Sequence, residues 1–189
     1  MTPVSPLLQA LYDGRPDEAE RILAANPELT LYEAAATGDV RRLVELDPDS
    51  EAANTRTPDG YTPLHLAAYF DQPHAATLLL RAGASPGRLS HTRSRVQPLH
   101  SAVAGRSTAA SCLLLLAGAE SDARQEGGYT PLHGAAQNGD VALVELLLAY
   151  GAGSATKTDD GRTASDLAAG AGHGDLAARL ESLSARQIA

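Results

Sequence analysis

Apolar and small residues recur along this chain in a fixed pattern with a period near 33 residues. Residues 62–68 are TPLHLAA, residues 97–103 are QPLHSAV and residues 130–136 are TPLHGAA. Weaker copies, LTLYEAA and TASDLAA, begin at residues 29 and 163, so successive copies start 33, 35, 33 and 33 residues apart. A repeat of this length predicts a single elongated array of stacked units instead of separate compact domains.

Each copy carries the signals of a short helix that is followed by a second, more apolar helix. In the copy that begins at Thr62, the threonine hydroxyl can cap free N–H groups, and Pro63 suits the first helical position because its missing donor costs nothing there. Leucine-rich runs at residues 78–80, 113–116 and 146–148 predict the second helices. The glycines after these runs favour the left-handed turns that end a helix: Gly83, Gly118 and Gly151.

The motif T-P-L-H-x-A-A at this spacing resembles the ankyrin repeat family, and the resemblance covers nearly the whole chain. It implies an all-α solenoid of about six helix–turn–helix units with short hairpin-like fingers. We expect one domain over residues 1–189. Its approximate units are an N-terminal cap at 5–28, full units at 29–61, 62–96, 97–129 and 130–162, and a C-terminal cap at 163–189.

The two terminal units depart from the repeat in ways that suit caps. Residues 6–25 predict two helices, and the 24 residues from Gly14 to Gly38 leave no room for a finger. In the last unit, Ser165 and Asp166 stand where Leu and His are usual, and polar residues follow along a second helix at about residues 175–183. Polar outer faces would shield the ends of the core from water. The last six residues, 184–189, are expected to fray.

Charge and composition narrow the classes of partner. The chain has 15 Lys and Arg against 23 Asp and Glu, and this net charge of −8 argues against nucleic acid as a partner. Only residues 61–110 are basic, with one acid and five bases. The single cysteine, Cys112, excludes an internal disulfide. No run approaches the ~18 apolar residues of a membrane span, so we expect a cytoplasmic protein that does not bind membranes.

Three histidines, His65, His100 and His133, recur at one position of the repeat. The resemblance implies that each imidazole hydrogen-bonds within its own turn and to the neighbouring unit. The alternative is a metal or acid–base array, but side chains one unit apart along a stack do not surround a point. Residues 151–158, GAGSATKT, approach the phosphate-binding loop pattern, yet Thr156 replaces its second glycine. We therefore predict no catalytic residue, no metal and no cofactor.

The resemblance also implies a concave face, formed by the fingers and by exposed positions of the inner helices, where a partner would bind. Tyr69 and Phe70 stand at such positions and include the only Phe of the chain. Aromatic side chains supply large contact areas at binding sites. The alternative for Phe70 is local packing under the neighbouring finger. Gln137 and Asn138 occupy the same positions two units later and are further candidates. Tyr61 and Tyr129 directly precede inner helices and are candidates on the same face; the alternative is that they pack on the next finger.

The finger at residues 84–96 is two residues longer than the others. Arg95 occupies the position that holds glycine in the other fingers, so we expect this finger not to adopt the same turn easily. One hypothesis is that the basic finger, residues 88–95, receives an acidic or phosphorylated segment. Its binding residues would be Arg88, Arg93 and Arg95, with His91 between them and Tyr69 and Phe70 as an apolar anchor. The alternative is a solvated, flexible loop.

The sequence thus predicts a non-catalytic protein–protein interaction module whose partner binds the concave face. One alternative is a binder of a phosphorylated or acidic ligand, such as nucleic acid or a lipid headgroup, through the basic finger. Another is a structural subunit that self-associates through Tyr69 and Phe70. We expect a protein partner, and a monomer or a weak homo-oligomer.

Overall fold

The computed structural model describes residues 4–25 and 28–188, and every regular element within these residues is helical. The predicted all-α class is therefore confirmed. The helices are α1 (Pro6–Tyr12), α2 (Pro16–Ala25), α3 (Leu31–Thr37), α4 (Val40–Leu46), α5 (Ser50–Asn54), α6 (Pro63–Tyr69), α7 (Pro73–Arg81), α8 (Pro98–Ala104), α9 (Thr108–Leu116), the 3₁₀ turn η1 (Glu126–Gly128), α10 (Pro131–Gln137), α11 (Val141–Ala149), α12 (Ala164–Gly170) and α13 (Gly174–Ile188).

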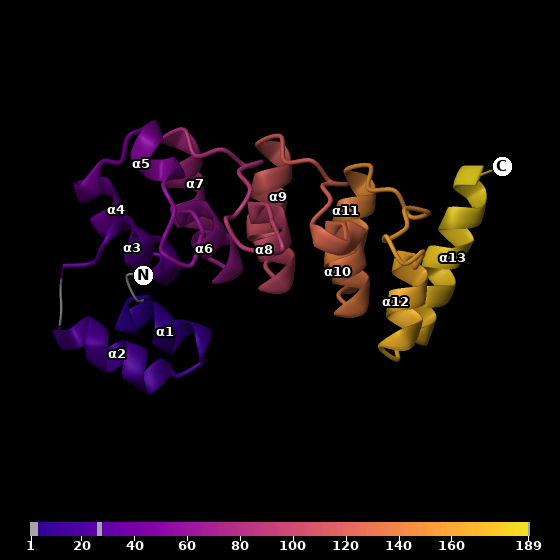
Figure 1. Cartoon of the computed structure of the whole chain (residues 1–189), viewed down its shortest axis with the longest axis horizontal. Helices are drawn as coiled ribbons and strands as arrows, with labels where there is room; N and C mark the ends of the chain where they lie inside the picture. The colour runs from indigo at the N-terminus through magenta and orange to yellow at the C-terminus, as the bar shows by residue number, and fades with distance from the viewer. Residues whose placement is uncertain (1–3, 26–27, 189) are drawn as a thin grey trace.

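Helix pairs follow one another along the long axis of the molecule, which is an elongated solenoid (Figure 1). An inner layer contains α3, α6, α8, α10 and α12, and each of these helices packs against its neighbours in the layer. Behind it, α4, α7, α9 and α11 form an outer layer in the same order. One continuous core of leucines and alanines runs between the layers, as the repeat of the sequence predicts.

The inner helices approach one another closely because small residues lie between them. The clearest case is Gly105, where an added Cβ would lie 1.9 Å from the carbonyl oxygen of Tyr69 in the preceding unit. No side chain fits at that distance. Glycine at this position therefore brings the end of α8 against the end of α6, and the inner layer forms a closed surface.

Each finger is a tight turn closed by a backbone hydrogen bond, and neighbouring fingers are bonded to one another. In the first finger, the N–H of Thr57 donates to the carbonyl of Tyr61 at 2.8 Å. In the long finger, the N–H of Ser90 donates to the carbonyl of Val96 at 2.8 Å. The N–H of His91 then donates to the carbonyl of Gly60 at 2.9 Å, which ties the second finger to the first. These bonds make a rigid edge along the array.

The long finger keeps the glycine turn, although we expected that Arg95 could not adopt it easily. Arg95 adopts a φ of 50°, in the left-handed region where Gly60, Gly128 and Gly161 also lie. Its N–H donates to the carbonyl of Thr92 at 3.2 Å, just as that of Gly60 donates to Thr57 at 2.8 Å. The turn is kept at the cost of about 1 kcal/mol of backbone strain. The finger is fixed on both sides, by the bond of His91 to Gly60 and by a bond from the N–H of Glu126, in the next finger, to the carbonyl of Ser94 at 3.0 Å.

Two other features differ from the sequence-based expectations. Helix α5 is a third helix in the unit at residues 29–61, which we expected to contain two, and the side chain of Asn54 at its end donates to the carbonyl of Gly83 at 2.8 Å. Helix α13 continues to Ile188, so the last described residues are helical and not frayed. At α5, the hydrogen bond to Gly83 stabilises a helix that the local sequence does not signal. At α13, the apolar face of the helix stays packed along the array, so the helix continues to its end.

The N-terminal pair, α1 and α2, does not continue the stack. It lies beneath α3 and α6, on the side of the inner layer, whereas α12 and α13 extend the array at the other end (Figure 1). Helix α1 packs on α2 and α3. Its Leu7 belongs to the main core, whereas Leu8 joins a second, smaller cluster with Ala36 and Leu66.

Candidate partner-binding groove

A groove with a volume of about 580 Å³ runs along the inner layer, over α6, α8 and α10 and the fingers that precede them. Four of the six tyrosines of the chain line it: Tyr12, Tyr61, Tyr69 and Tyr129. Its remaining walls are mostly apolar or uncharged. Among the described residues that line it, Glu126 is the only one of the Asp, Glu, Lys and Arg type. The groove thus combines aromatic surface with few fixed charges.

Half of the predicted partner-binding residues line the groove: Tyr61, Tyr69, Tyr129, Gln137 and Asn138. Phe70 is outside the lining but packs against Tyr69, with ring centroids 5.0 Å apart. The four residues of the basic finger are also outside the lining: Arg88, His91, Arg93 and Arg95. Most candidates chosen from inner-helix positions and helix starts therefore converge in the groove, whereas those of the basic finger do not line it.

Tyr69 and Phe70 belong to an aromatic cluster whose third member is Tyr12 of α1. The ring centroids of Tyr12 and Tyr69 are 6.3 Å apart, and those of Tyr12 and Phe70 are 5.5 Å apart. Tyr69 remains 38% exposed, but Phe70 is half-buried in the second apolar cluster, next to α1. Phe70 therefore packs against α1, in a cluster to which Tyr61 of the first finger also belongs.

The basic finger is held by the finger that follows it. The guanidinium of Arg93 pairs with the Glu126 carboxylate at 3.0 Å, and the N–H of Glu126 donates to the Ser94 carbonyl at 3.0 Å. The Arg93 side chain is 91% exposed, so this ion pair contributes little stability. Arg88 and Arg95 are exposed, and among the described residues neither forms an ion pair.

The end of the groove near α1 is electronegative. Burial raises the pKa of Tyr12 above its usual range, and the negative charge of Asp59 raises it further. The pKa of Tyr61 is raised by the same two causes in the same order. Both phenols therefore stay neutral at physiological pH, and the Asp59 carboxylate lies close enough to act on each of them. Neither Tyr12 nor Asp59 was singled out from the sequence.

The repeated histidines have a structural role in this surface. The N–H of Thr62 donates to Nδ1 of His65 at 3.3 Å, and the Thr62 hydroxyl lies 2.7 Å from the same nitrogen. Nε2–H of His65 donates to the carbonyl of Val96, in the next unit, at 3.0 Å. This confirms the predicted bonding within the turn and between units for His65. His100 and His133 accept from the N–H groups of Gln97 and Thr130 in their own turns, but Nε2 of each forms no hydrogen bond of regular geometry with the described residues. Burial lowers the pKa of His65 and of His100 to about 4, so both imidazoles are neutral.

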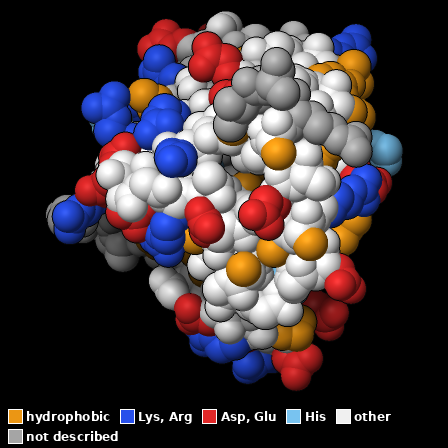
Figure 2. Space-filling model, turned by 90° about the vertical axis from the view of Figure 1, so that its right-hand side faces the viewer, with side chains coloured by type: hydrophobic (Ala, Val, Ile, Leu, Met, Phe, Trp, Pro, Cys, Tyr) orange, Lys and Arg blue, Asp and Glu red, His pale blue; other side chains and the backbone are white. Residues whose placement is uncertain are grey.

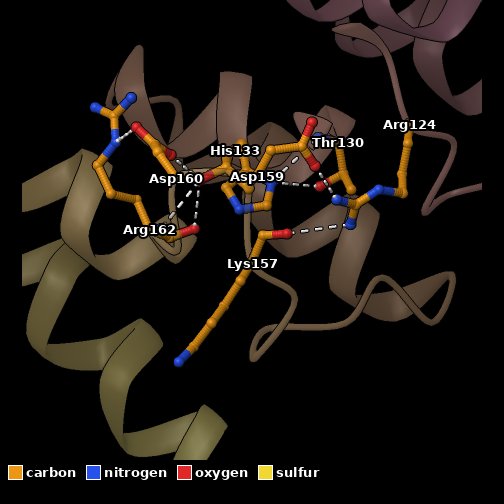
Figure 3. A network of polar contacts seen from close by, with 8 residues as sticks. Arg124, Thr130, His133, Lys157, Asp159, Asp160 and Arg162 are labelled. Carbon is orange, nitrogen blue, oxygen red and sulfur yellow. Dashed lines mark hydrogen bonds and ion pairs between the residues drawn. The ribbon is translucent and has the colours of Figure 1, made fainter. Parts of the chain in front are cut away.

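A polar network surrounds the finger at residues 157–162 (Figure 3). The Arg162 guanidinium donates to the Tyr129 hydroxyl, lies 5.8 Å from the centre of its ring and pairs with Asp160 at 2.7 Å. Arg124 pairs with Asp159 at 3.0 Å and donates to the carbonyl of Lys157 at 3.1 Å. The Lys157 side chain points away from this network (Figure 3). These bonds hold the segment as a finger with two carboxylates, which is unsuited to a phosphate.

No group of three or more His, Cys, Asp or Glu side chains that could hold a metal ion occurs among the residues that the structure describes. In the same residues, no helix combines the length and the apolar character that are needed to cross a membrane.

Comparisons with known proteins agree with the repeat architecture. A family profile described as ankyrin repeats (3 copies) matches residues 31–125 and 99–185. The human protein neurogenic locus notch homolog protein 4 is 48% identical over 73 residues, which cover 38% of this chain. The same match covers 4% of the length of that relative. The similarity therefore concerns a short repeat region within a much longer protein.

Proposed function

The chain belongs to the ankyrin repeat family, and from this premise we propose that it is a non-catalytic binding module whose protein partner lies in the groove over α6, α8 and α10. Ankyrin repeats are generally protein–protein interaction modules, and the family is generally non-catalytic. The observation that carries the proposal is the convergence of four tyrosines in one groove of about 580 Å³. Tyrosine is enriched at the centres of protein interfaces because it buries a large area with few rotatable bonds.

Two properties of the groove suit a protein segment. The amide side chains of Gln137 and Asn138 line it beside the aromatic rings, and amides bond the N–H and C=O groups of a peptide backbone. The fingers along one side are bonded to one another, so the wall is rigid before the partner arrives. A preformed surface loses little conformational entropy on binding, which favours affinity.

Binding of an acidic or phosphorylated ligand by the basic finger is the second candidate. The exposed positions of Arg88 and Arg95, without ion-pair partners among the described residues, favour it. The pairing of Arg93 with Glu126 weakens it, because the carboxylate already neutralises the arginine nearest to the groove. Self-association, a monomeric state and a cytoplasmic location remain predictions from the sequence.

Co-purification of partners from the native host tests the proposal. The wild type is compared with a groove variant, Tyr69→Ser/Gln137→Ala, and with a control on the outer layer, Val44→Ser/Leu116→Ser, whose side chains are 61% and 68% exposed. We expect a protein that the wild type and the control recover and the groove variant loses. Loss with Arg88→Glu/Arg95→Glu instead would favour the basic finger. Equal recovery on all four chains would show that the groove is not the site.

A further inference from the structure

We infer that the end of the groove nearest α1 binds a cationic side chain, Arg or Lys, from an extended segment of the protein partner, with Tyr12, Tyr61 and Tyr69 around the cation and Asp59 as its counter-charge. The inference rests on the proposed function, to which it adds the chemistry of the partner.

Three separate elements bring aromatic rings to this end of the groove. Tyr12 comes from the end of α1, Tyr61 from the first finger and Tyr69 from the end of α6, and all three line the groove. The rings of Tyr12 and Tyr69 meet edge to face, at an interplanar angle of 61°. The face of a tyrosine ring is electron-rich and attracts Lys and Arg cations, most strongly where water is excluded.

Asp59 supplies the opposite charge and lacks a cation of its own. Its Oδ1 atom is buried and accepts no hydrogen bond of regular geometry from the described residues, and the hydrogen-bonding group that faces the carboxylate is the neutral hydroxyl of Tyr12. It forms no ion pair with a described Lys or Arg, and Arg56 of the same finger donates to the carbonyl of Leu89 at 2.9 and 3.2 Å. A neutral phenol leaves the charge of this carboxylate uncompensated. A guanidinium or ammonium held among the tyrosine rings would compensate it by charge attraction at short range, without contact with the buried oxygen.

Toward the other end of the groove, a tyrosine already contacts a cation that the chain itself supplies. There Arg162 lies over the ring of Tyr129 and pairs with Asp160, and both residues belong to the unit after Tyr129. Tyr61 occupies the repeat position of Tyr129, but the unit that follows Tyr61 has Val96 where Arg162 stands. Tyr61 therefore lacks the arginine that accompanies Tyr129, and its nearby carboxylate, Asp59, comes from its own finger.

The charges along the groove favour a basic segment over an acidic or phosphorylated one. Its lining includes the carboxylate of Glu126 and, among the described residues, no Lys or Arg. A phosphate or carboxylate inside it would be repelled by Glu126 in the lining and by Asp59, whose charge acts on Tyr12 and Tyr61. An extended segment with one cation at the α1 end and uncharged side chains beyond it matches this pattern. The amides of Gln137 and Asn138 then lie beside its backbone.

Selection from a random library of 12-residue peptides, displayed on phage and applied to the immobilised full chain, tests the inference. We expect enriched peptides to share one Arg or Lys with apolar neighbours. In a synthetic copy of an enriched peptide, exchange of that cation for Gln should weaken binding by about 10-fold, which is in the range of a desolvated cation–π contact with an ion pair. In the variant Asp59→Asn, replacing the peptide cation by Gln should weaken binding by less than about 2-fold, because the counter-charge is gone.

Asp160→Asn is the matched control, because it removes a carboxylate from the same repeat position while Arg162 stays with Tyr129. It should keep the 10-fold preference. Circular dichroism verifies that both variants fold. Enrichment of acidic peptides, an undiminished preference in Asp59→Asn, or no enrichment at all would each overturn the inference. The proposed function would still stand in these cases if co-purification recovered a partner that the groove variant loses.

Discussion

The two ends of the molecule close the same core in different ways. At the C-terminal end, α13 packs on α12 and α12 on α10, so the last pair continues the stack. At the N-terminal end, α1 and α2 leave the stack and lie beneath α3 and α6 (Figure 1). The C-terminal pair only covers the core, whereas the N-terminal pair also contributes Tyr12 to the groove. A terminal unit can therefore be a cap and part of a binding site at once.

The composition of the two pairs explains the difference. Helix α13 is amphipathic: Leu180 is buried in the core, and Arg179 faces outward to pair with Glu145 at 2.7 Å. In Figure 2, which views this end, hydrophobic side chains form small separate areas among polar atoms. Helix α1 has apolar groups on two faces, because Leu7 packs in the main core while Leu8 packs in the second cluster with Tyr12. A helix with two apolar faces must contact two surfaces.

The largest expected effect comes from removing one core leucine at each end. Leu7→Ala and Leu180→Ala each leave a cavity at a side chain that is 1% or 0% exposed, so each should lower the free energy of unfolding by about 3 kcal/mol, measured by urea denaturation. Only Leu7→Ala should also weaken partner binding, because α1 carries Tyr12. If partner binding fell equally in both variants while both were folded, the claim that only the N-terminal pair contributes to the groove would be contradicted.

The framework of the fold could be predicted because its signals are local and repeated. The start of each inner helix lies within a few residues of the groups that cap it, such as Thr62 and His65. The exposed positions of the inner helices follow from the same register, and for this reason Tyr69 and Gln137 were found. A pattern that occurs three times also tolerates single departures, as the turn at Arg95 shows.

The remaining parts of the site depend on contacts between distant segments. Tyr12 meets Tyr69 only because the N-terminal pair turns beneath the stack, and no residue near Tyr12 signals that turn. The basic finger was chosen for its charge, but charge in a sequence does not reveal that Arg93 pairs with Glu126 in the next unit. The parts of the site that depend on the direction of side chains and on contacts between distant segments therefore could not be predicted from the sequence.

Acidification should destabilise the middle units of the array, which contain the buried histidines, before the units that flank them. In the middle, His65 and His100 have a pKa of about 4 in the folded chain because they are buried, against about 6.5 when unfolded. Between these values the unfolded chain binds protons that the folded chain does not, so stability is complete above pH 6.5 and falls as the pH drops. Each histidine should lower the free energy of unfolding by about 2 kcal/mol at pH 5.

The first full unit and the C-terminal cap have carboxylates where the middle units have imidazoles. Burial raises the pKa of Glu33, but hydrogen bonds from Thr30 outweigh it and lower the pKa below its usual value. Hydrogen bonds from Thr163 lower the pKa of Asp166. The stability that these two carboxylates contribute to the folded chain is lost only at more acidic pH. Hydrogen exchange at pH 5 should therefore increase in α6 and α8 before α12, and His65→Gln/His100→Gln should flatten the dependence of stability on pH. Uniform opening of the array would contradict this expectation.

Replacement of the aromatic contact at α1 should have a moderate effect. Tyr12→Ser removes the ring that packs on Tyr69 and Phe70 at 6.3 and 5.5 Å, so we expect a loss of about 2 kcal/mol in unfolding free energy. Binding of a groove ligand should weaken by about 10-fold, measured by calorimetry on the folded variant. Tyr12→Phe is the control, since it keeps the ring packing. Full binding by Tyr12→Ser would show that the N-terminal pair is a cap and no more.

The smallest effect is expected at the outward side of the C-terminal pair. Arg179→Ala breaks the ion pair with Glu145, in which both side chains are about half exposed. Such a pair contributes less than about 1 kcal/mol, because water already solvates both charges and salt screens them. The melting temperature should shift by a few degrees at most, and binding in the groove should stay unchanged. A clear loss of binding would mean that the two ends communicate through the stack, and the groove could then no longer be treated as a site that the N-terminal pair alone completes.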